Sequence, residues 1–182
     1  MNDAGMAKPE QTDIDKQIVA FGENLRQARK HARLTQIELS ATAPLDRAAI
    51  SRLECGERAP DLPTLLRICS ALGVEPRDLL RGIGPAGPPH SVPRSAHIPE
   101  RRVAGSSEHG ARFGANLKWA RTRAGLSQER LALDAKVDRA AISVYENGGR
   151  EPNLRTVLKL ALKLDVRPSV LLDGIGTPRQ SR

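Results

Sequence analysis

Apolar residues recur along the first part of the chain at spacings of three and four, which is the period of an amphipathic helix. A first helix is predicted by Ile18, Phe21, Leu25, Ala28 and Ala32. No stretch of useful length alternates apolar and polar residues with the period of two that a half-buried strand requires. The pattern therefore predicts an all-α protein.

Polar residues at helix starts divide the following segment into further short helices. Thr35 can cap a second helix, with Glu38 completing a capping box. Asp46 can cap a third helix that runs through Glu54, and Gly56 supplies the left-handed residue that ends it. The apolar positions of a fourth helix and a brief fifth one are Leu62, Leu65, Leu66, Cys69, Leu72, Leu79 and Leu80.

This pattern occurs twice. Residues 21–84 and 113–176 align without a gap at an offset of 92 residues, and 32 of the 64 aligned pairs are identical. The longest identical run, residues 46–51, recurs as residues 138–143. A repeat of this length is a duplicated domain rather than a stacked unit of a solenoid. We therefore expect two five-helix domains.

Composition between the repeats suggests the domain limits. We expect a disordered N-terminal arm at 1–15, a first domain at 16–84, a flexible linker at 85–112, a second domain at 113–176 and a disordered tail at 177–182. The arm is polar and acidic, without an apolar period. The linker holds five prolines and three glycines in 28 residues, and a flexible chain of that length spans roughly 30 Å.

The charge balance favours a polyanionic partner. The chain carries 29 Lys and Arg against 21 Asp and Glu, a formal net charge of +8. A basic excess of this kind favours nucleic acid over a membrane surface, and no stretch is apolar enough to predict a membrane span. We expect a cytoplasmic protein associated with the nucleoid.

The residue types that usually carry catalysis or bind metals do not form a recognisable motif in this sequence. Cys55 and Cys69 lack CxxC spacing and are replaced by Asn147 and Ala161 in the second copy, which argues against a metal site and against a disulfide framework. No nucleophile and base recur together either. We therefore expect neither enzyme activity nor a cofactor.

The second and third helices of each copy are joined by a short turn, at residues 42–45 and 134–137. This is helix-turn-helix spacing, in which the second helix of the pair enters the major groove of DNA. Ile50 and Leu53 must face the core. The outward arc then consists of Arg47, Ala48, Ser51 and Arg52, and in the second copy of Arg139, Ala140, Ser143 and Val144.

These outward residues suit contacts with DNA. Arg47 and Arg139 can pair with two acceptors of guanine, and Ala48 and Ala140 can pack on a thymine methyl group. The alternative is that the arginines are ordinary surface residues or touch phosphate alone. At the start of the preceding helix, donors to phosphate are offered by Thr35 and Gln36, and by Ser127 and Gln128.

Each copy resembles a Cro/C1-type helix-turn-helix domain, of the family also called Xre-like. The residues that carry the resemblance include Leu34, Thr35, Gln36, Leu39, Ala43, Ile50, Ser51, Gly56, Pro60, Leu72, Gly73 and Val74, and in the second copy Leu126, Ser127, Gln128, Ile142, Ser143, Asn147, Gly148 and Pro152. The resemblance implies a lambda-repressor-like five-helix fold for both copies. It also implies phosphate contacts for Gln36 and Gln128, and base-facing roles for Arg47, Ala48 and Arg52 and for Arg139, Ala140 and Val144. A buried ion pair is implied for Arg29 with Glu54 and for Arg121 with Glu146.

Two departures from the family pattern set the copies apart. The family usually has glycine in the turn, where Pro44 and Lys136 stand here, and proline suits a turn of negative φ. Arg52 is replaced by Val144, which can make only apolar contacts. We therefore expect either that the two copies prefer different DNA half-sites or that one copy no longer reads bases.

The sequence predicts a transcriptional regulator of bacterial or phage type, most simply a repressor, that binds double-stranded DNA with two readers on one chain. The linker can place the domains about one DNA turn apart (~34 Å) without enforcing that distance. The alternative is that one copy reads DNA while the other is a protein-interaction module, for dimerisation or for antitoxin-like capture of a partner.

Overall fold

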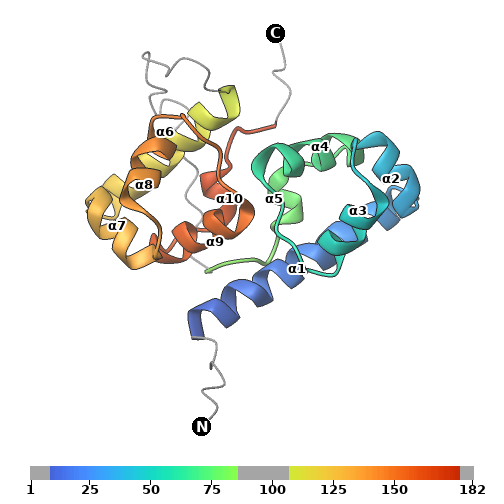
Figure 1. The fold of residues 1–182 in the computed structure, drawn as a ribbon, viewed down its shortest axis with the longest axis horizontal. Coiled ribbons are helices and arrows are strands. Elements are labelled where there is room, and N and C mark those ends of the chain that lie inside the picture. Colours follow the sequence, from blue (N-terminus) through green and yellow to red (C-terminus); the bar gives the residue numbers. More distant parts are fainter. Residues whose placement is uncertain (1–8, 86–106, 177–182) are drawn as a thin grey trace.

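The computed structural model describes residues 9–85 and 107–176, which form ten helices in two groups of five (Figure 1). The first group consists of α1 (Pro9–His31), α2 (Gln36–Thr42), α3 (Arg47–Glu54), α4 (Leu62–Leu72) and α5 (Pro76–Leu79). The second group consists of α6 (Glu108–Arg123), α7 (Gln128–Ala135), α8 (Arg139–Glu146), α9 (Leu154–Lys163) and α10 (Pro168–Leu171). The predicted all-α class and the five helices of each copy are confirmed.

The helix starts follow the capping residues. The Thr35 hydroxyl accepts a hydrogen bond from the Glu38 N–H at 3.2 Å, and the Glu38 carboxylate accepts one from the Thr35 N–H at 2.7 Å. Asp46 accepts from the Ala49 N–H at 2.6 Å at the start of α3. These bonds satisfy N–H groups that the first turn of a helix leaves without a partner, so they define where α2 and α3 begin.

The N-terminal boundary predicted from the sequence is wrong. Helix α1 begins at Pro9, so residues 9–15 are helical rather than part of an arm. Ile14 is only 2% exposed and extends the apolar stripe of Ile18 and Phe21 by one turn. A single apolar residue among polar neighbours is a weak signal by itself, and its burial depends on a distant segment of the chain. Residues 1–8 of the predicted arm lie outside the described residues.

The start of the second domain was also placed too late. Helix α6 begins at Glu108, after Ser107, whose hydroxyl accepts from the Gly110 N–H at 2.9 Å. Residues 108–112 are therefore helical, and Gly110 is buried, although glycine is a poor helix former. The rest of the predicted linker, 86–106, and the predicted tail lie outside the described residues.

Each group closes around its own apolar core. In the first, Phe21 and Leu25 of α1 pack with Leu39 and Ile50, and all four side chains are fully buried. In the second, the rings of Phe113 and Tyr145 meet edge to face with centroids 6.2 Å apart, in an interior built mainly from aliphatic residues. The core fixes α3 and α8 against α1 and α6, because one side of each short helix is buried.

The two groups meet through a symmetric pair of main-chain hydrogen bonds. The Leu62 N–H donates to the Pro152 carbonyl at 3.1 Å, and the Leu154 N–H donates to the Pro60 carbonyl at 2.8 Å. Because the copies are offset by 92 residues, each bond is the image of the other when the copies are exchanged. They flank a single antiparallel bridge, and within residues 9–85 and 107–176 there is no strand. The contact has the isologous form of a two-fold dimer interface.

The short last helices also meet at this interface. Helices α5 and α10 lie side by side near the centre of Figure 1 and are in contact. A Cβ atom built on Gly84 would stand 2.5 Å from Pro168 Cδ, and one built on Gly176 would stand 2.9 Å from Leu66 Cδ2. Both glycines have positive φ, 88° and 78°, so this close approach needs a residue without a side chain.

One part of the interface is not symmetric. The first turns of α1 extend beyond the repeat and run beneath α9 of the second group (Figure 1). There the Asp15 carboxylate accepts a hydrogen bond from Arg155 at 2.5 Å. The extension of α1 therefore ties the first domain to the second. Among the described helices, none is both long and apolar enough to cross a membrane.

Candidate nucleic-acid interface

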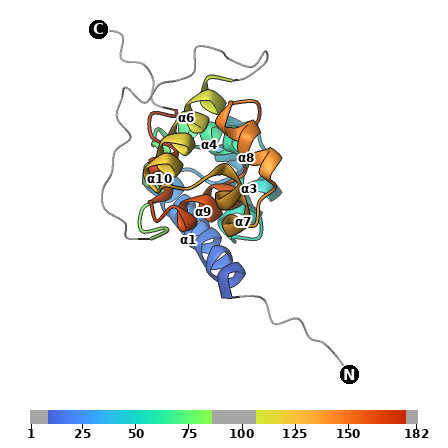
Figure 2. The ribbon, with the colours of Figure 1, turned by 90° about the vertical axis from the view of Figure 1, so that its left-hand side faces the viewer.

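Helices α2 and α3, and likewise α7 and α8, form two helix-turn-helix units. On α3 the buried side chains are Ile50 and Leu53, and on α8 they are Ile142, Tyr145 and Glu146. The remaining arc of each helix faces outward, as the sequence predicts. In Figure 2 both α3 and α8 lie on the same side of the molecule.

The predicted base-facing residues lie on these outward arcs. Exposed side chains on α3 are Arg47, Ala48 and Arg52, and on α8 they are Arg139, Ala140 and Val144. Ser51 and Ser143 lie at the edge of the arcs and are half-buried. The first helical position of each unit therefore presents a guanidinium group, with a methyl group beside it.

The turn between the paired helices differs from the expectation. Pro44 has φ 21° rather than a negative value, and Lys136, at the same position of the second copy, has φ 50°. Both residues thus stand where the chain needs a positive φ, the conformation that glycine adopts most easily. The expectation of a negative φ at Pro44 was wrong. The two turns still differ, because α2 ends at Thr42 with Ala43 as its C-cap, whereas α7 ends at Ala135 with the left-handed Lys136 as its C-cap.

Behind the outward arc of each helix-turn-helix unit lies a buried polar network. In the first copy the Glu54 carboxylate accepts from Arg29 Nε at 2.5 Å and Nη2 at 3.0 Å, and from the Gln36 amide at 2.9 Å. The side chains of Arg29 and Glu54 are only 11% and 4% exposed. Arg29 also donates to the Leu34 carbonyl at 2.8 Å, at the end of the loop that leads into α2. The network joins α1, α2 and α3.

The second copy reproduces this network. Glu146 accepts from Arg121 Nε at 2.6 Å and from the Gln128 amide at 2.7 Å. Arg121 donates to the Leu126 carbonyl at 2.7 Å. The ion pairs that the resemblance implies are thus present at both sites, and each carboxylate also holds the glutamine at the start of the preceding helix.

Ionisation in the first network favours the ion pair. Burial opposes the charged form of Glu54, but hydrogen bonds from Arg29 and Gln36 outweigh it and leave the pKa of this carboxyl below its usual value. The hydrogen bond to Glu54 raises the pKa of Arg29, and the bond to Glu146 raises the pKa of Arg121 in the same way. The pair of Arg29 and Glu54 therefore stays charged at neutral pH.

The predicted phosphate-facing residues have local partners. The Thr35 and Ser127 hydroxyls cap α2 and α7, and both residues are exposed. Gln36 and Gln128 are half-buried and use one amide hydrogen each for the buried carboxylates, which leaves the second hydrogen for another acceptor. These residues line the N-terminal ends of the first helix of each helix-turn-helix unit.

A charged contact between the two helices of the second helix-turn-helix unit has no equivalent in the first unit. Arg139 Nη2 lies 3.0 Å from the Glu129 carboxylate, which the second residue of α7 supplies. The equivalent position in the first copy is Ile37, a large apolar side chain that is 63% exposed. Sequence reasoning missed Glu129, although the aligned pair of isoleucine and glutamate was a visible signal.

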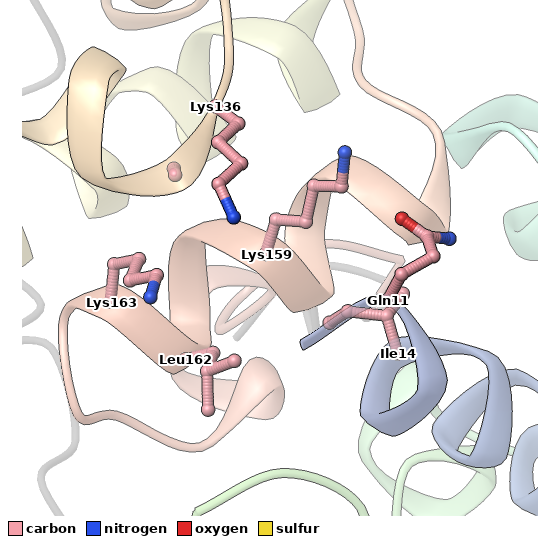
Figure 3. A pocket seen from close by; sticks show the side chains of 7 residues that line it. Gln11, Ile14, Lys136, Lys159, Leu162 and Lys163 are labelled. Carbon is pink, nitrogen blue, oxygen red and sulfur yellow. The ribbon is translucent and has the colours of Figure 1, made fainter. Parts of the chain in front are cut away.

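A small cavity of about 90 Å³ marks the seam between the domains, where α1 crosses α9 and the end of α7 (Figure 3). Its lining residues are Gln11, Ile14, Ala135, Lys136, Lys159, Leu162 and Lys163. The lining thus combines three lysines and a glutamine with three apolar residues, and it contains no carboxylate and no catalytic nucleophile. The cavity lies where the acidic first turns of α1 meet the basic helix α9, and its lining does not have the residues of a catalytic cleft.

Metal binding finds no support in residues 9–85 and 107–176. These segments contain no group of three or more histidine, cysteine, aspartate or glutamate side chains placed to hold an ion. Cys55 is exposed at the end of α3, while Cys69 is buried, and burial raises the pKa of its thiol to about 12. His109, assigned to the linker from the sequence, lies in the first turn of α6.

The fold and the exposed second helix of each pair define a helix-turn-helix protein with two such units on one chain. The family model described as Helix-turn-helix (HTH_3) matches residues 25–79 and again residues 117–171. The chain therefore belongs to this helix-turn-helix family, of the Cro/C1 type, and contains the family domain twice.

Similar proteins each match one domain's length. A prophage-derived HTH-type transcriptional regulator of Bacillus subtilis, YonR, is 42% identical over 62 residues, which are 34% of this chain and 57% of that protein. The control protein C.BamHI of Bacillus amyloliquefaciens is 39% identical over 61 residues, 33% of this chain and 75% of that protein. The chain spans little more than half the length of the first of these relatives.

A solved structure matches on the same scale. The restriction-modification controller protein C.AhdI of Aeromonas hydrophila is 37% identical, covers 34% of this chain and 94% of its own, and has a TM-score of 0.34.

Proposed function

We propose that this protein is a transcriptional regulator that binds double-stranded DNA in a sequence-specific manner and uses both helix-turn-helix units on one site. Membership of the family, the net charge of +8 and the exposed arcs of α3 and α8 support this function. Its place of action would be the cytoplasm, on the nucleoid, and repression is the simplest outcome of occupying an operator.

The observation that carries the two-reader proposal is the reciprocal contact of Leu62 with Pro152 and of Leu154 with Pro60. Regulators of this kind read DNA as two-fold pairs, with recognition helices in major grooves one helical turn apart. A chain whose two units pair through an isologous contact provides such a pair within one molecule. Tethering makes binding of the second unit intramolecular.

The roles proposed for single residues follow from their positions. Arg47 and Arg139 would read guanine, with Ala48 and Ala140 against a neighbouring thymine methyl. Phosphates would be contacted by Thr35, Gln36, Ser127 and Gln128, and the edges of the two readers would be completed by Ser51, Arg52, Ser143 and Val144. Because Arg52 and Val144 differ, the half-sites should be unlike.

Selection of bound sites from random double-stranded DNA tests the proposal. The full chain should select a composite site of two unlike halves about one turn apart. Arg47→Ala and Arg139→Ala should each weaken binding roughly tenfold or more and relax one base position, each in its own half. Arg81→Ala, which changes an exposed arginine at the end of α5, is the matched control. A single half-site that is indifferent to Arg139→Ala would rule out the second reader.

The alternative, in which one copy is a protein-interaction module, has one observation in its favour. Leu133 on α7 is 71% exposed and Val144 on α8 is 41% exposed, so the helix-turn-helix unit of the second copy presents two large apolar side chains to solvent. This surface would suit a homodimer or a protein partner, including a toxin-like one. Leu133→Lys should then abolish association with that partner while Arg139→Ala leaves DNA binding intact.

A further inference from the structure

We propose that Glu129 is a positioning residue that sets the base preference of the second reader through Arg139. The inference rests on the proposed function, in which Arg139 reads a base. It adds a residue that lies on the first helix of the unit, outside the recognition helix.

The geometry places the two side chains together across the helix-turn-helix unit. Arg139 is the first residue of α8 and Glu129 the second residue of α7, and their Nη2 and Oε1 atoms are 3.0 Å apart. The side chains are 68% and 66% exposed, so the pair lies on the outer surface of the unit. An ion pair this exposed adds little to folding stability. Its consequences should therefore appear in DNA binding.

The first copy is an internal control for this contact. The α3 segment 46–51 is identical to the α8 segment 138–143, so Arg47 and Arg139 start from the same local sequence. They differ at the aligned position of the preceding helix, which is Ile37 in the first copy and Glu129 in the second. An isoleucine cannot accept a hydrogen bond, so it cannot orient the Arg47 guanidinium in this way.

The chemistry of the guanidinium allows orientation and base reading together. Arginine has five N–H donors in a rigid plane, and one contact with Glu129 leaves enough donors for a two-bond contact with guanine. Holding the plane in advance reduces the rotamers lost on binding and disfavours other bases. The carboxylate also repels nearby phosphates, so it should lower affinity for all sequences. Glu129 should thus make the second reader weaker but more selective.

Reciprocal exchange in the full-length chain tests this inference. Binding is measured on the selected composite site and on sites with each other base at the position that depends on Arg139. Glu129→Ile should raise affinity for all these sites several-fold and lower discrimination between them by about three- to tenfold. Ile37→Glu should do the opposite at the base that depends on Arg47. Glu129→Gln, which keeps an acceptor without the charge, should raise affinity and retain part of the discrimination.

The outcomes separate this inference from the proposed function. If Arg139→Ala relaxes its base position while Glu129→Ile leaves the discrimination there unchanged, Glu129 does not position the arginine. If Arg139→Ala itself changes nothing, the second reader fails and the inference fails with it. Equal thermal unfolding midpoints of wild type and Glu129→Ile would show that the change in discrimination does not come from loss of structure.

Discussion

At the scale of single residues, a buried carboxylate in each copy links the core to the proposed DNA-binding face. Glu54 and Glu146 each receive hydrogen bonds from an arginine of the first helix of their domain and from a glutamine of the second. The same carboxylate thus neutralises a buried charge and orients a residue proposed to face phosphate. Changing it should affect stability and DNA binding together.

Replacing Glu54 with glutamine should lower the free energy of unfolding by about 3–5 kcal/mol, because Arg29 is left buried without its counter-charge. Urea unfolding followed by far-ultraviolet circular dichroism measures the loss. Glu57→Gln changes an exposed glutamate three residues away and should change stability by less than about 0.5 kcal/mol. Equal losses in the two variants would contradict the buried ion pair.

The same pair predicts a dependence on pH. The pKa of Glu54 is depressed in the folded protein, so its stabilising contribution is complete above the ordinary glutamate pKa of about 4.3 and is lost as the pH falls through the folded value. The difference in unfolding free energy between wild type and Glu54→Gln should therefore be constant near neutrality and shrink below about pH 4.3. Urea titrations between pH 7 and pH 3 measure it. If the difference in unfolding free energy between the two proteins stays constant to pH 3, the folded protein does not stabilise Glu54 as an anion.

At the scale of elements, two features stand out. The turns before α3 and α8 orient the paired helices, and the extended helix α1 contacts the second domain. The turns before α3 and α8 both place a residue other than glycine at positive φ. Helix α1 is longer than its counterpart α6, and its additional turns contact the other domain. The positive φ without glycine should cost stability in each turn, and the additional turns of α1 should stabilise the contact between the domains. Both effects can be measured with single substitutions.

Pro44→Gly should stabilise the protein by about 1–2 kcal/mol, because the proline ring opposes the φ of 21° that the turn requires. Lys136→Gly should gain less than about 1 kcal/mol, because a left-handed lysine is strained less than such a proline and glycine costs more entropy on folding. Thermal unfolding measures both variants. A lower midpoint for Pro44→Gly would mean that the turn does not strain this residue.

Ile14→Ala should loosen the first turns of α1 from α9, because it removes a side chain that is only 2% exposed. The loss should be about 2–5 kcal/mol of local stability. Hydrogen exchange should accelerate in residues 11–16 and in the facing side of α9, while amides around Leu25 stay protected. Thr12→Ala, at an exposed position two residues away, is the control. Uniform acceleration along all of α1 would contradict a local contact.

At the scale of the whole molecule, the two domains pair with each other through surfaces that occupy equivalent positions in the repeat. The reciprocal bonds of Leu62 and Leu154, and the contact of α5 with α10, place the domains in a two-fold arrangement. The asymmetric α1 extension adds a second tie on one side. The separation of the readers should therefore depend on this interface, and little on the segment that joins the domains.

Inserting ten Gly and Ser residues between residues 86 and 106 should leave the preferred separation of the two half-sites unchanged. If the connecting segment alone set the distance, a longer one would broaden the accepted spacings. Binding to a series of DNAs in which the half-sites are moved apart one base pair at a time measures this preference. A broadened series for the insertion variant would contradict the role of the interface.

Much of this protein follows from the sequence by itself. The helix starts at Thr35 and Asp46, the short turns and the inward face of α3 depend on contacts within a few residues, so periodicity and capping predict them. The family resemblance predicts the buried ion pairs of arginine and glutamate. The second copy repeats the helix caps, the short turn and the ion pair.

Only the tertiary structure decided how the copies meet. The burial of Ile14, the reciprocal bonds of Leu62 and Leu154 and the contact of Glu129 with Arg139 join segments that local patterns treat as separate. Their energies depend on whether two distant surfaces fit, and no short-range preference encodes that fit. The sequence by itself determined two copies of one helical domain. Tertiary packing decided that the two domains pair with each other and that their surfaces differ.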